Sequence, residues 1–216
     1  MNSNTPNLRT RIKFCGITRA EDAGLAVGLG VDALGFILVP ASPRFIAPEA
    51  AYEIRCKVPP LVSTVALFRN AEPALVREAL KVLKPDFAQF HGDEDVAFCE
   101  SFGIPYFKAV AMADPQDLPK LAQTFASAAA LLLDGHDASS MGGSGQTFDW
   151  SRVQSVNKPL ILAGGLKPAN VAEGIAQARP YAVDVSSGIE TSPGIKDSEK
   201  MRAFVLAVRR ADQEQQ

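Results

Sequence analysis

Short apolar segments alternate along the chain with segments whose apolar residues recur at helical spacing. Several of the short segments are continuous apolar runs, as expected for strands that are buried on both faces. The predicted strands are Arg11–Cys15, Ala33–Leu38, Leu61–Phe68, Phe87–Phe90, Pro105–Ala109, Ala130–Asp134, Leu160–Ala163 and Ala182–Val185. Because helix candidates lie between these strands, the pattern predicts repeated βα units and a parallel sheet.

The helix candidates carry start and stop signals. The first is predicted to begin at Thr18, whose hydroxyl can form a capping box with Glu21, and to end at Gly30. The third lies near Glu72–Leu83, and the last starts around Asp197.

Prolines mark two further helix candidates. Asp114-Pro115 and Leu118-Pro119 interrupt the segment Ala111–Ala128 after the fifth strand. We therefore expect a fifth helix that is short or missing. The seventh helix is predicted to open with Pro168 near its first turn.

Eight βα units in 216 residues favour a closed (β/α)8 barrel over an open doubly wound sheet. An open nucleotide-binding sheet would carry its glycine-rich turn after the first strand, where the chain reads Cys15-Gly-Ile-Thr18 without a GxGxxG pattern. We predict a single barrel domain over residues 1–216, with frayed tails at about residues 1–10 and 211–216.

Two glycine-rich turns near the C-terminus each follow a predicted strand directly. They read Leu162-Ala-Gly-Gly-Leu166 and Asp184-Val-Ser-Ser-Gly-Ile-Glu190, and they fall after the last two strands, where such barrels usually hold phosphate. Glycine lets the backbone approach an anion closely, and successive N–H groups supply donors without a charged side chain. The sequence therefore predicts a small phosphorylated ligand. The residues expected to hold its phosphate are Gly164, Gly165, Ser186, Ser187 and Gly188.

Composition excludes several other classes of protein. A formal charge of −2 and a pI near 5.7 argue against a nucleic-acid surface. No apolar stretch approaches the roughly 20 residues that span a bilayer, and the N-terminus lacks the apolar core of a signal peptide, so we expect a cytoplasmic protein. The cysteines Cys15, Cys56 and Cys99 suit neither a disulfide framework nor a metal site, and His91 and His136 are the only histidines. We predict no metal and no other cofactor.

Reactive side chains gather at the predicted C-terminal ends of strands, where barrel enzymes carry their active sites. The first strand ends with Lys13 and Cys15, the fourth with His91, the sixth with Asp134 and the eighth with Asp184. Cys15 and Asp134 would face each other across the mouth of the barrel as an acid–base pair. Each also has a purely structural interpretation, since free cysteines are mostly small buried hydrophobes and aspartate before glycine often caps a loop or helix.

Seven groups of motifs run in order along nearly the whole chain. They are Lys13-Phe-Cys-Gly-Ile-Thr18, Gly35-Phe-Ile with Ser42-Pro-Arg44, Gln89-Phe-His-Gly-Asp-Glu94, Leu133-Asp-Gly135, Gly142-Gly-Ser-Gly-Gln-Thr-Phe-Asp-Trp150 and the two glycine-rich turns. Together they resemble the phosphoribosylanthranilate isomerase family. The sequence departs from the family pattern at Phe14 and Phe90, where aliphatic residues are frequent, and at Gln146, where lysine is frequent.

The resemblance implies an isomerase of tryptophan, and hence aromatic amino-acid, biosynthesis. Its reaction converts N-(5-phosphoribosyl)anthranilate into 1-(2-carboxyphenylamino)-1-deoxyribulose 5-phosphate. This Amadori rearrangement needs an acid that protonates the furanose ring oxygen and a base that removes the C2 proton. By resemblance, Asp134 is the acid and Cys15 the base, Arg44 binds the anthranilate carboxylate, and Gly143 and Gly145 help to bind the phosphate.

Both catalytic groups would need shifted pKa values, because an ordinary carboxyl titrates at about 3.9 and an ordinary thiol at about 8.5. We expect ligand burial to raise the pKa of Asp134 and Lys13 to lower that of Cys15, since residues two apart in a strand point the same way. Alternatively, Lys13 pairs with a carboxylate such as Asp184, which could also bind ribose hydroxyls. His91 is expected to be a hydrogen-bonded residue beside the substrate.

The glycine- and serine-rich stretch 135–146 is expected to be a loop that closes over the ligand and excludes water. The predicted partner is thus a small phosphorylated substrate, with neither nucleic acid nor membrane involved. The sequence allows either a monomer or a homodimer.

Other activities remain open. A histidine-pathway aminoaldose isomerase would use the same chemistry, although such barrels normally carry two aspartates and two similar halves. A ribulose-phosphate epimerase would need metal-binding histidines that this chain lacks. A catalytically silent phosphosugar-binding barrel would keep the two glycine-rich turns without needing Cys15 and Asp134 together.

Overall fold

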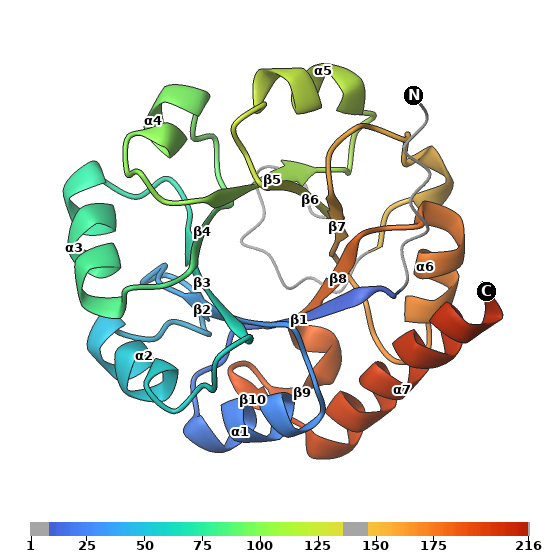
Figure 1. Cartoon of the computed structure of the whole chain (residues 1–216), viewed down its shortest axis with the longest axis horizontal. Coiled ribbons are helices and arrows are strands. Elements are labelled where there is room, and N and C mark those ends of the chain that lie inside the picture. The colour runs from blue at the N-terminus through green and yellow to red at the C-terminus, as the bar shows by residue number, and fades with distance from the viewer. Residues whose placement is uncertain (1–8, 136–146, 216) are drawn as a thin grey trace.

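Eight parallel strands close into a barrel with helices arranged around it (Figure 1). The computed structural model describes residues 9–135 and 147–215. The strands are β1 (Arg11–Cys15), β2 (Ala33–Ile37), β3 (Ser63–Phe68), β4 (Phe87–Phe90), β5 (Tyr106–Ala111), β6 (Ala130–Asp134), β7 (Leu160–Leu162) and β8 (Ala182–Val185). They pair in chain order, and β8 pairs with β1 to close the ring. The predicted (β/α)8 barrel is therefore confirmed.

Helices cover the outside of the barrel. They are α1 (Ala20–Gly28), α2 (Pro48–Arg55), α3 (Pro73–Leu83), α4 (Val96–Glu100), α5 (Leu118–Thr124), α6 (Val171–Ala178) and α7 (Ser198–Glu214). Between β6 and β7, the described residues form a single 3-10 turn, η1 (Trp150–Arg152), instead of an α-helix. The turn η2 (Ser187–Ile189) and a hairpin of β9 (Glu190–Ser192) and β10 (Ile195–Lys196) join β8 to α7.

Two helix starts differ from the sequence prediction. The hydroxyl of Thr18 donates to the carbonyl of Gly194 in the β9–β10 hairpin, so it forms no capping box, and α1 begins at Ala20. Pro168 lies in a turn, and α6 begins at Val171. The expectation of a short fifth helix is correct, because α5 has seven residues and Asp117 caps its N-terminus.

The main hydrophobic core lies between the sheet and the helices, and a smaller cluster fills the inside of the barrel. Phe14 and Phe90, where the sequence departs from the family pattern, both belong to the outer core and are fully buried. The ring of Phe14 packs edge-on against Phe204 of α7, with centroids 6.0 Å apart. The larger aromatic rings therefore fill space under the helices and do not alter the barrel interior.

Residues 10 and 212, which lie inside the tails expected to fray, are hydrogen-bonded to each other, whereas residues 1–8 and 216 fall outside the described residues. Asp212 in α7 accepts hydrogen bonds from the backbone N–H and the hydroxyl of Thr10, at 2.9 and 2.6 Å. Ala211 is buried, and α7 continues to Glu214. These contacts join residues 202 positions apart, which explains why local composition did not reveal them.

Candidate active site

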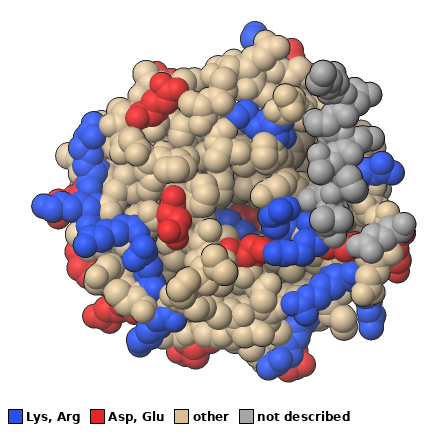
Figure 2. All heavy atoms as spheres, in the orientation of Figure 1, with Lys and Arg blue, Asp and Glu red and all other residues tan. Residues whose placement is uncertain are grey.

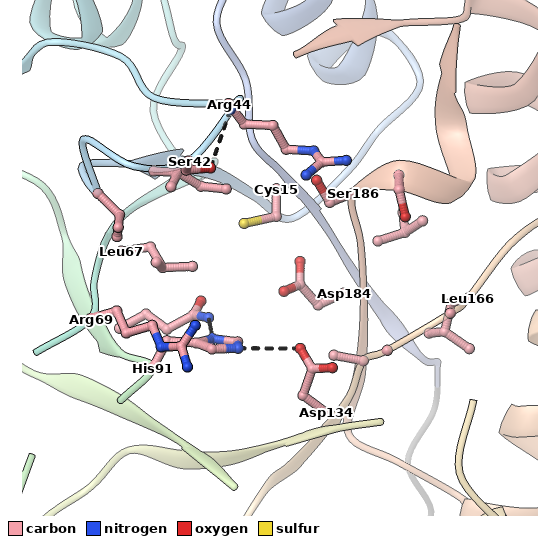
Figure 3. A pocket seen from close by; sticks show the side chains of 18 residues that line it. Cys15, Ser42, Arg44, Leu67, Arg69, His91, Asp134, Leu166, Asp184 and Ser186 are labelled. Atoms are coloured by element: carbon pink, nitrogen blue, oxygen red, sulfur yellow. Dashed lines mark hydrogen bonds and ion pairs between the residues drawn. The ribbon is translucent and has the colours of Figure 1, made fainter. Parts of the chain in front are cut away.

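One cavity lies at the carboxyl ends of the barrel strands (Figure 3). Nine residues predicted from the sequence line it: Cys15, Arg44, His91, Asp134, Gly164, Gly165, Asp184, Ser186 and Ser187. Lys13, which binds the lining residue Asp184, and Gly188, which follows the lining residue Ser187, are not part of this lining. Gly143, Gly145 and nearly all of the predicted closing loop fall outside the described residues. Basic and acidic side chains are interspersed on the molecular face seen in Figure 2.

The predicted acid–base pair reaches this cavity from two separate strands. Cys15 is the last residue of β1, and Asp134 is the last residue of β6. Both are buried, with 4% and 8% of their surface exposed, and both line the same cavity. The structure therefore brings together the thiol and the carboxyl that the sequence singled out.

Lys13 contacts both a carboxylate and the thiol. It is the register partner of Asp184 across β1 and β8, and its Nζ lies 2.9 Å from Oδ2 of that residue. Burial opposes the charged form of Lys13, but Asp184 and Cys15 hold its pKa above the ordinary value. Burial raises the pKa of the Cys15 thiol, and a hydrogen bond and the charge from Lys13 oppose that rise. Lys13 therefore both pairs with Asp184 and favours the thiolate of Cys15. Burial has the larger effect on Cys15, so its pKa is raised overall, in contrast to the lowering expected from the sequence.

Gly35 provides the space that these two side chains occupy. It is the register partner of Cys15 on β2, and a Cβ at Gly35 would lie 2.8 Å from Sγ of Cys15 and 3.1 Å from Nζ of Lys13. Gly35 was not among the site residues predicted from the sequence. The available signal was its Gly35-Phe-Ile motif, in the predicted strand that follows the one ending in Cys15.

Replacing Gly35 with alanine is expected to displace the Cys15 thiol and lower kcat by roughly 10- to 100-fold, because small misplacements of a reacting group are costly. A Cβ at Gly28, in α1, would meet nothing within 4 Å, so Gly28→Ala is the matched control and should keep wild-type kcat. Steady-state kinetics on both variants measure the effect. Equal kcat values for the two variants would contradict this role for Gly35.

His91 links Asp134 to a buried amide. Nε2 of His91 lies 3.3 Å from Oδ2 of Asp134, and Nδ1 of His91 lies 2.8 Å from Nε2 of Gln89 (Figure 3). Gln89 is fully buried in β4, next to the last residue of that strand. Sequence reasoning identified His91 but gave Gln89 no role, although residues two apart in a strand share a face.

A second buried network connects Arg44 to the segment that follows β8. Nε and Nη2 of Arg44 bind both carboxylate oxygens of Glu190 at 2.9 to 3.1 Å. Burial alone would raise the pKa of Glu190, but Arg44 and Lys196 lower it below the ordinary value. Nζ of Lys196 also donates to the backbone carbonyls of Cys15 and Ser186, at 2.6 and 3.2 Å. Lys196, which the sequence analysis missed, thus joins the end of β1 to the turn after β8.

The two glycine-rich turns pack against each other at the rim of the cavity. Gly164 and Gly165 have φ values of +77° and +63°, a region that favours glycine. A Cβ at Gly188 would overlap the carbonyl oxygen of Leu166, so this glycine permits the close contact of the two turns. Within the described part of the chain, no acceptor takes the backbone N–H groups of Gly164, Gly165 or Ser186. These amides are therefore available to an anion.

Metal-binding groups of side chains and membrane-spanning helices are both absent from residues 9–135 and 147–215. Over these ranges, no three His, Cys, Asp or Glu side chains come together in a group that could hold a metal ion. In the same ranges, no helix combines the length and the apolar character needed to cross a membrane.

The chain forms a closed parallel barrel with a cavity at the carboxyl ends of its strands, and a thiol, a carboxyl and two glycine-rich turns line that cavity. These features are typical of (β/α)8-barrel enzymes that bind small phosphorylated ligands. The family model described as "N-(5'phosphoribosyl)anthranilate (PRA) isomerase" matches residues 12–207. The chain belongs to the N-(5'-phosphoribosyl)anthranilate isomerase family.

Similarity to relatives extends over nearly the full length of the chain. A protein of Stenotrophomonas maltophilia (strain R551-3), named N-(5'-phosphoribosyl)anthranilate isomerase, is 51% identical over 207 residues, which cover 94% of this chain and 95% of the relative. The crystal structure of phosphoribosyl anthranilate isomerase from Thermus thermophilus superimposes with a TM-score of 0.86 at 40% identity, covering 93% of this chain and 99% of that one. A further structure of the same enzyme, in complex with reduced 1-(o-carboxyphenylamino)-1-deoxyribulose 5-phosphate, gives a TM-score of 0.79 at 35% identity, with the same coverage.

Proposed function

We propose that this chain converts N-(5'-phosphoribosyl)anthranilate into 1-(o-carboxyphenylamino)-1-deoxyribulose 5-phosphate in tryptophan biosynthesis. The observation that carries the proposal is that Cys15 and Asp134 line one cavity beside glycine-rich turns whose amides have no acceptor among the described residues. Family membership and the ligand of the solved relative support the same reaction.

In the proposed reaction, Asp134 is the general acid and Cys15 the general base. Asp134 donates a proton to the furanose ring oxygen, and the bond between that oxygen and C1 breaks as the anilino nitrogen forms a C1=N double bond. Cys15 then removes the proton from C2 in its thiolate form, which the charges of Lys13 and Lys196 favour against the effect of burial. The resulting enolamine becomes the ketone. Two groups on opposite sides of the sugar suffice for these steps. The barrel supplies them from β1 and β6.

The proposed phosphate site is formed by the turns after β7 and β8. The amides of Gly164, Gly165 and Ser186 have no acceptor among the described residues, Ser187 lines the same cavity, and Gly188 lets the two turns approach. Gly143 and Gly145, outside the described residues, remain proposed phosphate ligands from the sequence.

The rest of the cavity suits the other parts of the substrate. Oδ1 of Asp184 is buried and has no hydrogen-bond partner in the described part of the chain, so it can accept a hydrogen bond from a ribose hydroxyl. The hydrogen bonds from Arg44 to Glu190 use Nε and Nη2 and leave out Nη1. We propose that Nη1 binds the anthranilate carboxylate. Lys13 and His91 complete the polar surroundings of the sugar.

Several sequence predictions are kept within this proposal. They are a single catalytic domain, a cytoplasmic location, activity without metal or other cofactor, and a monomeric or homodimeric state. A catalytically silent phosphosugar-binding barrel and a histidine-pathway aminoaldose isomerase are the alternatives that the experiment must separate.

The test mixes the purified chain with N-(5'-phosphoribosyl)anthranilate and follows the change in fluorescence as the substrate is consumed. We expect turnover in the presence of EDTA, and competitive inhibition by reduced 1-(o-carboxyphenylamino)-1-deoxyribulose 5-phosphate. Binding of this analogue without turnover would indicate the silent barrel. Turnover confined to a histidine-pathway aminoaldose would indicate the second alternative.

A further inference from the structure

The amide of Gln89 is buried at the cavity and contacts a ring nitrogen of His91, the residue beside the candidate acid Asp134. Its Nε2 faces Nδ1 of His91 at 2.8 Å, and Gln89 is 0% exposed. Its Oε1 is also buried and has no hydrogen-bond partner among the described residues. An amide nitrogen can only donate a hydrogen bond, so Nδ1 of His91 must accept it and carry no proton.

This contact fixes the state of the imidazole. With Nδ1 unprotonated, the ring proton resides on Nε2, which faces Oδ2 of Asp134 at 3.3 Å. A second proton on His91 would reside on Nδ1, so that two donors, Nδ1 of His91 and Nε2 of Gln89, would face each other. Only a flip of the Gln89 amide, which exchanges Nε2 and Oε1, would avoid this. A turned amide would leave both of its N–H groups where Oε1 now lies without a partner, and buried donors are more rarely left unpaired than buried carbonyl oxygens.

We propose that Gln89 is a positioning residue that keeps His91 neutral, so that the proton shared by His91 and Asp134 stays on the Asp134 carboxyl. The inference rests on the proposed role of Asp134 as general acid, because a carboxylate paired with an imidazolium could not donate that proton to the substrate. Neutral His91 can still donate its Nε2 proton to the carbonyl oxygen of the protonated carboxyl and thereby orient it.

Other ionisable groups surround this pair. Cys15, Arg44, Arg69 and Asp184 line the same cavity, and Lys13 binds Asp184 outside the lining. The lysine and the two arginines disfavour an additional positive charge on His91, whereas the carboxylate of Asp184 favours one. Lys13 already binds Asp184, which reduces that opposing influence. The hydrogen bond from Gln89 is the contact that acts on Nδ1 directly.

The first test is nitrogen NMR of histidine-labelled protein at neutral pH, with a His136→Gln variant used to assign the His91 signals. The wild type is expected to show an unprotonated Nδ1 and a protonated Nε2. In Gln89→Glu the new carboxylate can accept a proton from Nδ1, so both nitrogens should be protonated. A proton on Nδ1 of the wild type would overturn the proposal without reference to activity.

The second test compares pH–rate profiles of the wild type, Gln89→Glu and Gln89→Met. In Gln89→Glu the limb set by Asp134 should move to lower pH, and kcat at neutral pH should fall by roughly 10-fold or more. Methionine is similar in size to glutamine, but it can neither donate a hydrogen bond to His91 nor supply a carboxylate. In Gln89→Met the limb set by Asp134 should therefore lie closer to its wild-type position than in Gln89→Glu. A Gln89→Glu profile like that of the wild type would refute the proposal.

The two proposals can fail separately. If Asp134→Asn keeps full turnover, the proposed role of Asp134 is wrong whatever the imidazole does. If Asp134→Asn is inactive but His91 of the wild type carries its proton on Nδ1, only the role of Gln89 is wrong. Should Gln89→Glu not fold, as judged by circular dichroism, the NMR spectrum of the wild type still decides.

Discussion

Cys15→Ser and Asp134→Asn are each expected to lower kcat by about 10²- to 10⁴-fold, the usual contribution of a positioned acid or base. Serine is a far weaker base than a thiolate at neutral pH, and asparagine has no acidic proton to donate. Both replacements are nearly isosteric, so the cavity that these side chains line should persist. Binding of the reduced product analogue is therefore expected to stay within about threefold of the wild type.

Two matched controls accompany this experiment. Cys56 and Asp114 are both exposed and lie outside the cavity lining, so Cys56→Ser and Asp114→Asn should keep wild-type kcat. Fluorescence-followed turnover and analogue titration on all four variants give kcat and affinity separately. Retention of wild-type kcat by Cys15→Ser or Asp134→Asn would eliminate that residue as a catalyst.

Lys13→Met is expected to destabilise the protein by about 3–5 kcal/mol, because it leaves the buried carboxylate of Asp184 without its partner. The two side chains are only 4% and 8% exposed, so water can do little to solvate the remaining charge. Urea unfolding followed by circular dichroism measures the loss. The matched variant is Lys13→Met with Asp184→Asn, which removes both charges and should recover most of the lost stability.

Lys13→Met is also expected to change the pH dependence of the rate. Lys13 opposes the rise in the pKa of Cys15 that burial causes, and Asp184 adds to that rise. Without Lys13 the pKa of the thiol should be higher still, so the limb of the pH–rate profile set by Cys15 should move to higher pH. An unchanged profile would remove Lys13 from the catalytic account, and a double variant no more stable than Lys13→Met would show that the ion pair is not the source of the loss.

The strands were predictable because parallel strands buried on both faces leave a strong mark on the sequence. Four of the eight predicted strands, among them β1 and β6, have the same bounds in the structure. Helix ends were less predictable where tertiary contacts compete with local signals. Thr18 has the right spacing for a capping box, yet its hydroxyl binds the carbonyl of Gly194, 176 positions away. The described residues between β6 and β7 form only the 3-10 turn Trp150–Arg152, which the repeated βα pattern did not reveal.

The candidate site was predictable where a single strand end carries a reactive side chain. Cys15 and Asp134 follow directly from that rule. Residues that act through their neighbours were missed: Gly35 contributes only the absence of a side chain, Gln89 acts through a histidine, and Lys196 arrives from a hairpin 181 positions after the carbonyl it binds. Such roles depend on strand register and on loop paths, which a single sequence does not reveal.

The reach of Lys196 to the carbonyl of Cys15 has a consequence for how the protein is made. During synthesis, the strand that carries the thiol leaves the ribosome well before the lysine that binds its backbone, because 181 positions separate the two residues. A nascent chain that has not yet reached β10 would therefore carry Cys15 without its finished environment. Competence for the reaction should appear only after β10 has left the ribosome.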